Sequence, residues 1–213
     1  MNWAVIPIRT HVITENDEIV SLVGRYTAGI AGPQDIIAVA ESVVAITQKR
    51  AILPETVRPG LAARFLCRFP AKHGSLATPG AMQLAIQEAG LPRILLGCAA
   101  AFCGRLIGKK GFFYLVAGRE LAFIDDIAGT MWPYEKHIIL GPKEPDRVVH
   151  SIREATGTEA VVADVNDLKC VDILAATSPE SGRIAKEALV DNPFGNDDQQ
   201  TPIVVIKKVQ EGM

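Results

Sequence analysis

Three short apolar segments of this chain each run directly into a cluster of oxygen-bearing side chains. The first ends in Asp125 and Asp126, the second in Asp164 and the residues up to 167, and the third in the polar run 192–200. Such segments are typical of buried strands, and carboxylates and amides gathered at strand ends are the ligands that Mg²⁺ or Mn²⁺ takes. Asp and Asn are also common in surface loops because they favour turns. Together the three clusters indicate a divalent cation site, and turn formation is the alternative for each one alone.

The pattern around these clusters alternates strands with helices. Residues 3–9 and 35–46 are rich in Val, Ile and Ala and read as strands, the second so continuously apolar that burial on both faces is expected. Helical spacing predicts a helix over 17–28, and Thr78 followed by Pro79 predicts the start of another. The last third of the chain alternates strand and helix signals. We therefore expect an α+β or mixed α/β fold with some antiparallel pairing.

The middle of the chain has a different character. Residues 94–103 are the most apolar stretch, too short to cross a bilayer, and they predict a buried helix that could lie at a subunit interface. The glycine- and lysine-containing run 104–111 follows that helix instead of opening one, so it predicts a turn and not a phosphate-binding loop. Residues 112–116 then read as a strand.

Composition excludes several classes of protein. The 213 residues carry a formal net charge of −2 and only 6% aromatic residues, which argues against nucleic-acid binding and against a polybasic membrane anchor. Neither a signal peptide nor a disulfide or zinc spacing of the four cysteines is apparent. We expect a cytoplasmic protein that acts on a small molecule, built as a single unit over residues 1–213.

Two acidic residues stand out by their position. Glu41 interrupts the long apolar run 36–46, so its carboxylate either faces solvent at a strand bend or is held in a site, because burying it without a partner would be costly. Asp164 comes at the end of a buried strand, where ligands bind in open α/β sheets. The alternative for Asp164 is an N-cap of the turn at Asn166 to Leu168.

Four stretches of the chain carry a family resemblance. They are the opening strand and acid-rich helix start at 6–20, the segment 32–44, the segment 140–164 that ends at Asp164, and the closing strand 202–207. In order and spacing they resemble the gamma-glutamyl ligases of the deazaflavin redox coenzyme F-420. Members of that family use GTP and a divalent metal to join L-glutamate to the lactyl phosphate tail of the coenzyme precursor. The resemblance implies their fold, with mixed sheets, in an intertwined homodimer.

The resemblance also implies roles for individual residues. It makes Asp164, together with Asp125 or Asp126, ligands of Mg²⁺ or Mn²⁺. It brings a further set of residues towards the nucleotide, GTP or ATP, including a polar loop that closes over the base or the metal. That set is Ile8, Arg9, Glu41, Ser42, Lys49, Asp197, Asp198, Gln199 and Gln200.

The chain departs from the family pattern in the positions of its basic residues. Ser42 and Ile46 stand where the family has lysines, and Lys49 is the only lysine nearby. Val165 replaces the threonine after the strand-end aspartate, and the divergent middle segment 53–123, which could form a subdomain, carries no recognisable pattern. The alternative to a ligase is therefore a non-catalytic protein that keeps the fold and binds a small molecule or nucleotide.

Overall fold

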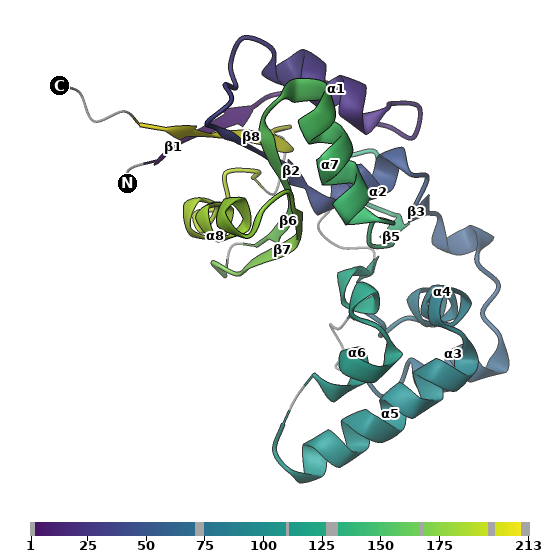
Figure 1. Ribbon diagram of the computed structural model, residues 1–213. Helices are drawn as coiled ribbons and strands as arrows, with labels where there is room; N and C mark the ends of the chain where they lie inside the picture. Colours follow the sequence, from purple (N-terminus) through teal and green to yellow (C-terminus); the bar gives the residue numbers. More distant parts are fainter. Residues whose placement is uncertain are drawn as a thin grey trace. The chain divides into compact units, whose positions relative to one another are not determined.

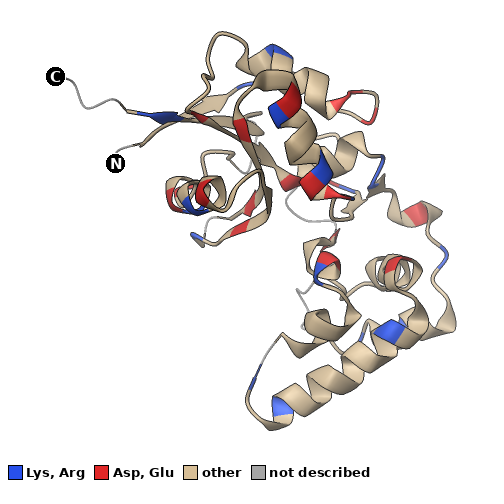
Figure 2. Ribbon diagram, in the orientation of Figure 1, with Lys and Arg blue, Asp and Glu red and all other residues tan. Residues whose placement is uncertain are grey.

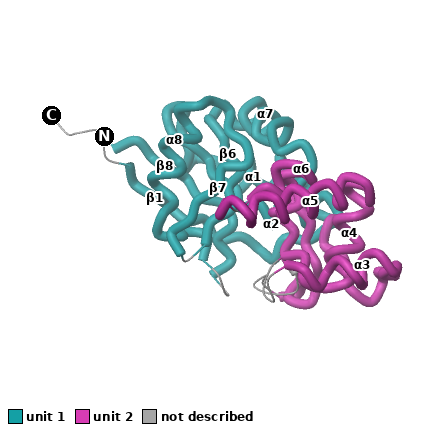
Figure 3. Tube along the Cα trace, turned by 90° about the horizontal axis from the view of Figure 1, so that it is seen from below, with its two compact units in different colours: residues 1–49, 142–213 teal, residues 50–141 magenta. Residues whose placement is uncertain are grey.

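The protein divides into two compact units. A computed structural model describes residues 3–70, 75–109, 111–126, 132–166, 168–195 and 199–209. Unit 1 combines Met1–Lys49 with Pro142–Met213, and unit 2 is the intervening Arg50–Gly141 (Figure 3). The divergent segment 53–123 lies within unit 2. Each unit is described separately below.

Unit 1 is built on a five-stranded mixed sheet with the strand order β1-β8-β2-β6-β7. β2 and β6 run parallel, whereas the pairs β1/β8, β8/β2 and β6/β7 are antiparallel. This sheet confirms the prediction of a mixed α/β fold. The strands are β1 (Trp3–Ile8), β2 (Ile36–Ala40), β6 (Glu159–Val165), β7 (Val171–Ala176) and β8 (Ile203–Lys208).

Helices cover both faces of this sheet (Figure 1). On one face, α1 (Ile19–Thr27) and α7 (Pro145–Thr156) pack with Ile37, Val39 and Val162 into one core. On the other face, α8 (Pro179–Ala188) packs against the alternate residues of the same strands. The central strands β2 and β6 are therefore buried on both sides, which explains their unbroken apolar sequences.

A short helix directly follows β2 and corrects one prediction. The expected strand over 35–46 ends at Ala40, and residues 41–47 form α2 (Glu41–Thr47) instead. Val44, Ala45 and Ile46 are buried as a helical face. The prediction was wrong because a short apolar run fits a buried strand and a buried helix equally well.

Unit 2 is mostly helical, with one small antiparallel sheet. That sheet has the order β3-β5-β4, from β3 (Ala51–Ile52), β5 (Ile138–Ile139) and β4 (Asp125–Asp126). Its helices are η1 (Pro54–Thr56), α3 (Leu61–Leu66), α4 (Pro79–Ala89), α5 (Leu91–Leu106), α6 (Phe112–Ala117) and η2 (Arg119–Phe123). The start predicted at Thr78 is confirmed: its hydroxyl accepts a hydrogen bond from the Ala81 N–H at 3.2 Å.

Residues 112–116 form part of helix α6 and not a strand, which corrects a second prediction. This helix packs closely on α5. Two glycines of α5 make this close approach possible. A Cβ atom on Gly97 would lie 2.8 Å from the Cβ of Ala117, and one on Gly104 would lie 2.9 Å from the ring of Phe112. Aromatic and β-branched residues favour strands only weakly, and helix packing overrides that preference here.

The outer face of α5 corrects a third prediction. The helix carries charge only at its two ends (Figure 2), yet Leu96, Phe102 and Leu106 are 63%, 66% and 73% exposed in the single chain. Only Ile94 and the two glycines of α5 are buried, so the expectation of a buried helix over 94–103 holds for one face alone. Among the described residues, no single helix is long and apolar enough to cross a membrane; α4 and α5 meet that test only as a pair bent by 111°.

Candidate functional site

One edge of the unit 1 sheet gathers most of the residues that the sequence singled out. β1, β2 and β6 end at this edge, while β7 and β8 begin there, because their pairings with β6 and β1 are antiparallel. We call it the carboxyl edge and define it as residues 8–10, 40–42, 163–165, 171–172 and 200–203. Ligands of open α/β sheets bind outside the carboxyl ends of the strands. The topology therefore places these residues where a ligand is expected.

Backbone hydrogen bonds hold the segments of the carboxyl edge together. The Thr10 N–H donates to the Gln200 carbonyl at 2.9 Å, and the Ala40 N–H donates to the Pro202 carbonyl at 2.9 Å. The predicted residues Ile8, Arg9, Glu41, Ser42, Asp164 and Gln200 all lie here. Ile8 is buried in the core, whereas Arg9 and the neighbouring Gln199 are exposed. Asp197 and Asp198 lie outside the described residues.

Glu41 is the most buried charged residue of the carboxyl edge, with 5% exposure. It is the first residue of α2, where the partial positive charge of a helix N-terminus favours a carboxylate. Of the two alternatives for Glu41, a solvent-facing strand bend is excluded. Ser42 follows it and is half-buried.

Asp164 lies opposite Asp172 in the β6/β7 pair. Burial raises the pKa of the Asp164 carboxyl above its ordinary value, and the negative charge of Asp172 raises this pKa further. In the turn after β6, the side-chain oxygen of Asn166 accepts from the N–H groups of Leu168 at 3.0 Å and Cys170 at 3.2 Å. Two facing carboxylates, one of them partly buried, are a donor set that fits a divalent cation.

The other predicted ligands belong to unit 2. Asp125 and Asp126 form β4, so the expected ligand set joins residues of both units and stays a prediction. Within the described part of the chain, no three His, Cys, Asp or Glu side chains form a group that could hold a metal ion. Lys49 is exposed, at the opposite end of α2 from Glu41, with a backbone φ of 61°.

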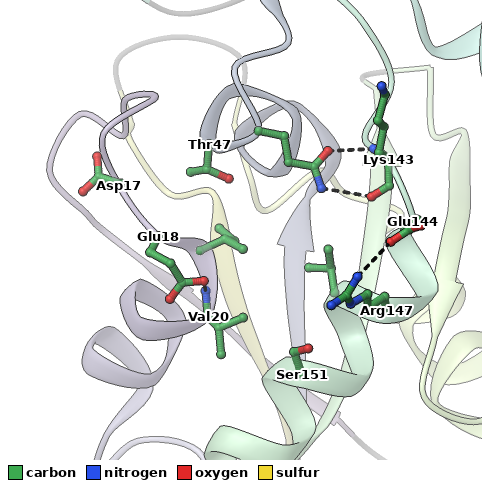
Figure 4. Close-up of a pocket in the computed structure, with 11 residues that line it drawn as sticks. Asp17, Glu18, Val20, Thr47, Lys143, Glu144, Arg147 and Ser151 are labelled. Carbon is green, nitrogen blue, oxygen red and sulfur yellow. Dashed lines mark hydrogen bonds and ion pairs between the residues drawn. The ribbon is translucent and has the colours of Figure 1, made fainter. Parts of the chain in front are cut away.

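A pocket of about 310 Å³ opens beside the carboxyl edge, on the face covered by α1 and α7 (Figure 4). α1 follows β1 and α7 precedes β6, so both helices begin near this end of the sheet. The last residues of α2 complete the wall. The lining residues are Asp17, Glu18, Ile19, Val20, Thr47, Gln48, Lys143, Glu144, Arg147, Val148 and Ser151.

The acidic side of this pocket is fixed by hydrogen bonds. The Glu18 carboxylate caps α1 by accepting from the N–H groups of Val20 at 3.0 Å and Ser21 at 2.8 Å. Asp17 accepts from the Thr14 N–H at 2.8 Å and contacts the His11 ring at 3.0 Å. Partial burial would raise the pKa of each carboxyl, but these hydrogen bonds outweigh it and each pKa lies below its ordinary value. Both groups are therefore ionised at neutral pH.

The basic side comes from the start of α7. The Gln48 side chain accepts from the Lys143 N–H at 2.7 Å and donates to the Lys143 carbonyl at 2.9 Å, which fixes the backbone of Lys143 (Figure 4). The Lys143 ammonium group has no hydrogen bond or ion pair with any described residue. Arg147 lies 3.4 Å from Glu144. The pocket thus has fixed charges of both signs.

None of these pocket residues was assigned to a site from the sequence. A usable signal was present. Pro145 marks a helix start, and a helix that precedes a parallel strand must begin at the carboxyl edge of that strand. The residues just before Pro145 could therefore have been placed beside the predicted site.

Sequence comparison supplies the family. No curated protein matches the chain. A family profile described as F420-0:Gamma-glutamyl ligase matches residues 7–165. The matched region runs from β1 through β6, includes Arg9, Glu41 and Asp164 of the carboxyl edge, and also covers the middle segment 53–123. The protein belongs to the F420-0:gamma-glutamyl ligase family.

Proposed function

We propose that the protein joins L-glutamate to the carboxylate of a deazaflavin coenzyme precursor, at the expense of GTP or ATP and with a divalent cation. The observation that supports this most directly is the carboxyl edge, where a family-matched chain brings Arg9, Glu41 and Asp164 to the carboxyl ends of β1, β2 and β6, which run in the same direction in one sheet. Ligase chemistry needs a site that holds a nucleotide, an acid and an amine together. The carboxyl edge, beside the N-termini of α1 and α7, is suited to holding these three reactants.

The side chains fit a divalent cation through their charge. The partly buried Asp164 faces Asp172, and burial together with the negative charge of Asp172 raises the pKa of the Asp164 carboxyl. Asp125 and Asp126 are the further ligands that we propose. A bound Mg²⁺ or Mn²⁺ would neutralise the nucleotide phosphates.

The proposed reaction transfers a phosphoryl group and then forms an amide. An oxygen of the acceptor carboxylate takes the terminal phosphoryl group of the nucleotide, and the nucleoside diphosphate leaves. The glutamate amine then attacks the acyl carbon, loses a proton to water, and phosphate leaves. In this proposal the chain positions the reactants, and Arg9, an exposed cation at the edge, pairs with a phosphate.

One observation favours a second candidate, a binding protein without catalysis. Ile46 stands at a family lysine position and is only 3% exposed, while Ser42 occupies the other lysine position. α2 therefore presents no lysine at the carboxyl edge. A nucleotide could bind there and remain intact.

Calorimetric titration and a product assay separate the two candidates. GTP and ATP are titrated into the full-length protein with and without Mn²⁺, and mass spectrometry follows glutamyl addition to the precursor. The ligase predicts metal-dependent nucleotide binding and a product one glutamate heavier. Metal-dependent nucleotide binding that gives neither a glutamylated product nor nucleotide hydrolysis identifies the binding protein. If nucleotide affinity does not change with metal, neither the ligase nor the binding-protein candidate has the proposed cation site.

A further inference from the structure

The pocket beside the carboxyl edge has the charge pattern of an amino-acid site. We propose that it binds the amino-acid substrate, an α-amino dicarboxylate, with its two carboxylates on Lys143 and Arg147 and its ammonium group on the acidic wall. This inference rests on the proposed function, since it places the glutamate of that reaction. It adds residues that lie outside the predicted nucleotide and metal set.

The basic wall comes from α7 and from the residues that lead into it. Arg147 and Ser151 lie four residues apart and therefore on one side of α7, and Lys143 lies two residues before the helix begins. Lys143 is fixed through its backbone by Gln48, and its ammonium group has no partner among the described residues. Arg147 and Glu144 are 81% and 71% exposed, so their ion pair is weak and a carboxylate ligand can replace it.

Asp17 and Glu18 lie on the opposite side of the pocket from Arg147 and the backbone of Lys143, whose side chain extends away from the pocket (Figure 4). Asp17 and Glu18 are held by backbone N–H groups and are ionised at neutral pH. A carboxylate has about four acceptor sites, so each retains capacity for an ammonium group. Two anchored carboxylates on one side and two cations on the other match a ligand with one positive and two negative groups.

Size and charge argue against a polyphosphate in the same place. The volume of about 310 Å³ is at the lower end of the range for small-molecule sites, about 300–1,000 Å³, and a nucleoside triphosphate needs more. Its phosphates would also face Asp17, Glu18 and Glu144. The apolar side chains of Ile19, Val20 and Val148 complete the lining and suit the methylene groups of an amino acid.

The test is calorimetric titration of the full-length protein with L-glutamate, alone and with Mn²⁺ and a non-hydrolysable GTP analogue. Glutarate, which lacks the ammonium group, L-glutamine, which lacks the second carboxylate, and inorganic phosphate are titrated in parallel. We expect L-glutamate to bind more tightly than all three. Lys143→Gln and Arg147→Gln should each weaken glutamate binding about tenfold or more, as expected for a lost charged hydrogen bond, and leave nucleotide affinity unchanged.

The matched control is Arg183→Gln. Arg183 is an exposed helix arginine paired with Glu187 on its own helix at 3.1 Å, as Arg147 is paired with Glu144, but it does not line the pocket. It should leave glutamate binding unchanged. Absence of glutamate binding under both conditions, equal binding of glutarate or phosphate, or wild-type affinity in Lys143→Gln and Arg147→Gln would overturn the inference. Metal-dependent nucleotide binding by the same samples shows that the proposed function survives such a failure.

Discussion

Asp164 and Asp172 occupy facing positions on the neighbouring strands β6 and β7. Like charges directly opposite each other on antiparallel strands are destabilising. The chain tolerates this repulsion at the edge of the sheet where its family resemblance places a metal ligand. The repulsion between these two carboxylates is therefore a measurable destabilisation at the proposed cation site.

The first prediction concerns Asp164→Asn. The folded pKa of Asp164 lies above its unfolded value, so the destabilisation is full at neutral pH and disappears as the pH falls through that folded pKa. Without metal, the variant should be more stable than wild type at pH 7 by about 0.5 kcal/mol, the scale of a cross-strand pair, and the two proteins should converge in acid. Thermal unfolding with and without Mn²⁺ measures this, and the variant should lose the stabilisation that Mn²⁺ gives.

Asp191→Asn is the control for that experiment. Asp191 is 89% exposed, and its ion-pair partner among the described residues is the exposed Lys169. Its removal should change neither the metal-free stability nor the effect of Mn²⁺. If Asp164→Asn behaves in the same way, Asp164 is not a cation ligand.

The second prediction concerns the cap of α1. Glu18→Ala removes both hydrogen bonds to the first turn and should cost about 1 kcal/mol at pH 7. Because the folded pKa of Glu18 lies below its unfolded value, this stabilisation is present above the unfolded pKa and is lost as the pH falls through the folded one. Urea unfolding at several pH values should show the difference from wild type shrinking below about pH 4. Glu154→Ala, a change at an exposed position of α7, is the control for this experiment.

The third prediction contrasts two glycines in helices. Gly97→Ala should cost about 1–3 kcal/mol, because the new Cβ would collide with Ala117 on α6. Gly24→Ala lies inside α1 with no atom within 4 Å of the added Cβ, and should instead stabilise by about 0.5–1 kcal/mol. Denaturant midpoints of the two variants should move in opposite directions. A shift of the same sign in both would mean that the close approach of α5 and α6 is not tightly packed.

The fourth prediction concerns assembly. If the outer face of α5 is covered in a homodimer, wild type should be a dimer at micromolar concentration and Phe102→Glu should make it monomeric, because the interface would bury an unpaired charge. Phe102 is 66% exposed in the single chain, so the change should not prevent folding. Leu168→Glu, at an 89% exposed position in unit 1, is the control and should remain dimeric. Light scattering that shows a monomeric wild type would exclude this role for α5.

Helix starts and strand ends could be predicted from the sequence, whereas short apolar runs could not. Thr78 with Pro79 marks a helix start through local chemistry, and Asp164 marks a strand end because a polar group follows a buried run. The runs at 42–46 and 112–116 were both taken for strands. Their helical form depends on what they pack against, which in the second case is a groove made by Gly97 and its neighbours.

Part of the candidate site could be predicted because strand ends are recognisable in the sequence. Arg9, Glu41 and Asp164 each follow an apolar segment, so a rule about strand ends finds them. Lys143 and Arg147 do not follow such a segment. Their position depends on the direction of α7, which runs back along the sheet from the carboxyl edge, so that its first turn lies near that edge.

The hydrogen bonds between Gln48 and Lys143 have a consequence for the architecture of the chain. The chain leaves unit 1 two residues after Gln48, and Lys143 is the second residue after the chain enters unit 1 again. Unit 2 is thus an insertion between two positions that unit 1 itself holds within hydrogen-bonding distance. A short turn could replace the insertion without stretching α2 or α7, since domains tolerate exchange where chain ends lie close together. This point of attachment lets one part of the molecule lengthen, shrink or be exchanged in evolution while the sheet that carries the carboxyl edge keeps its fold.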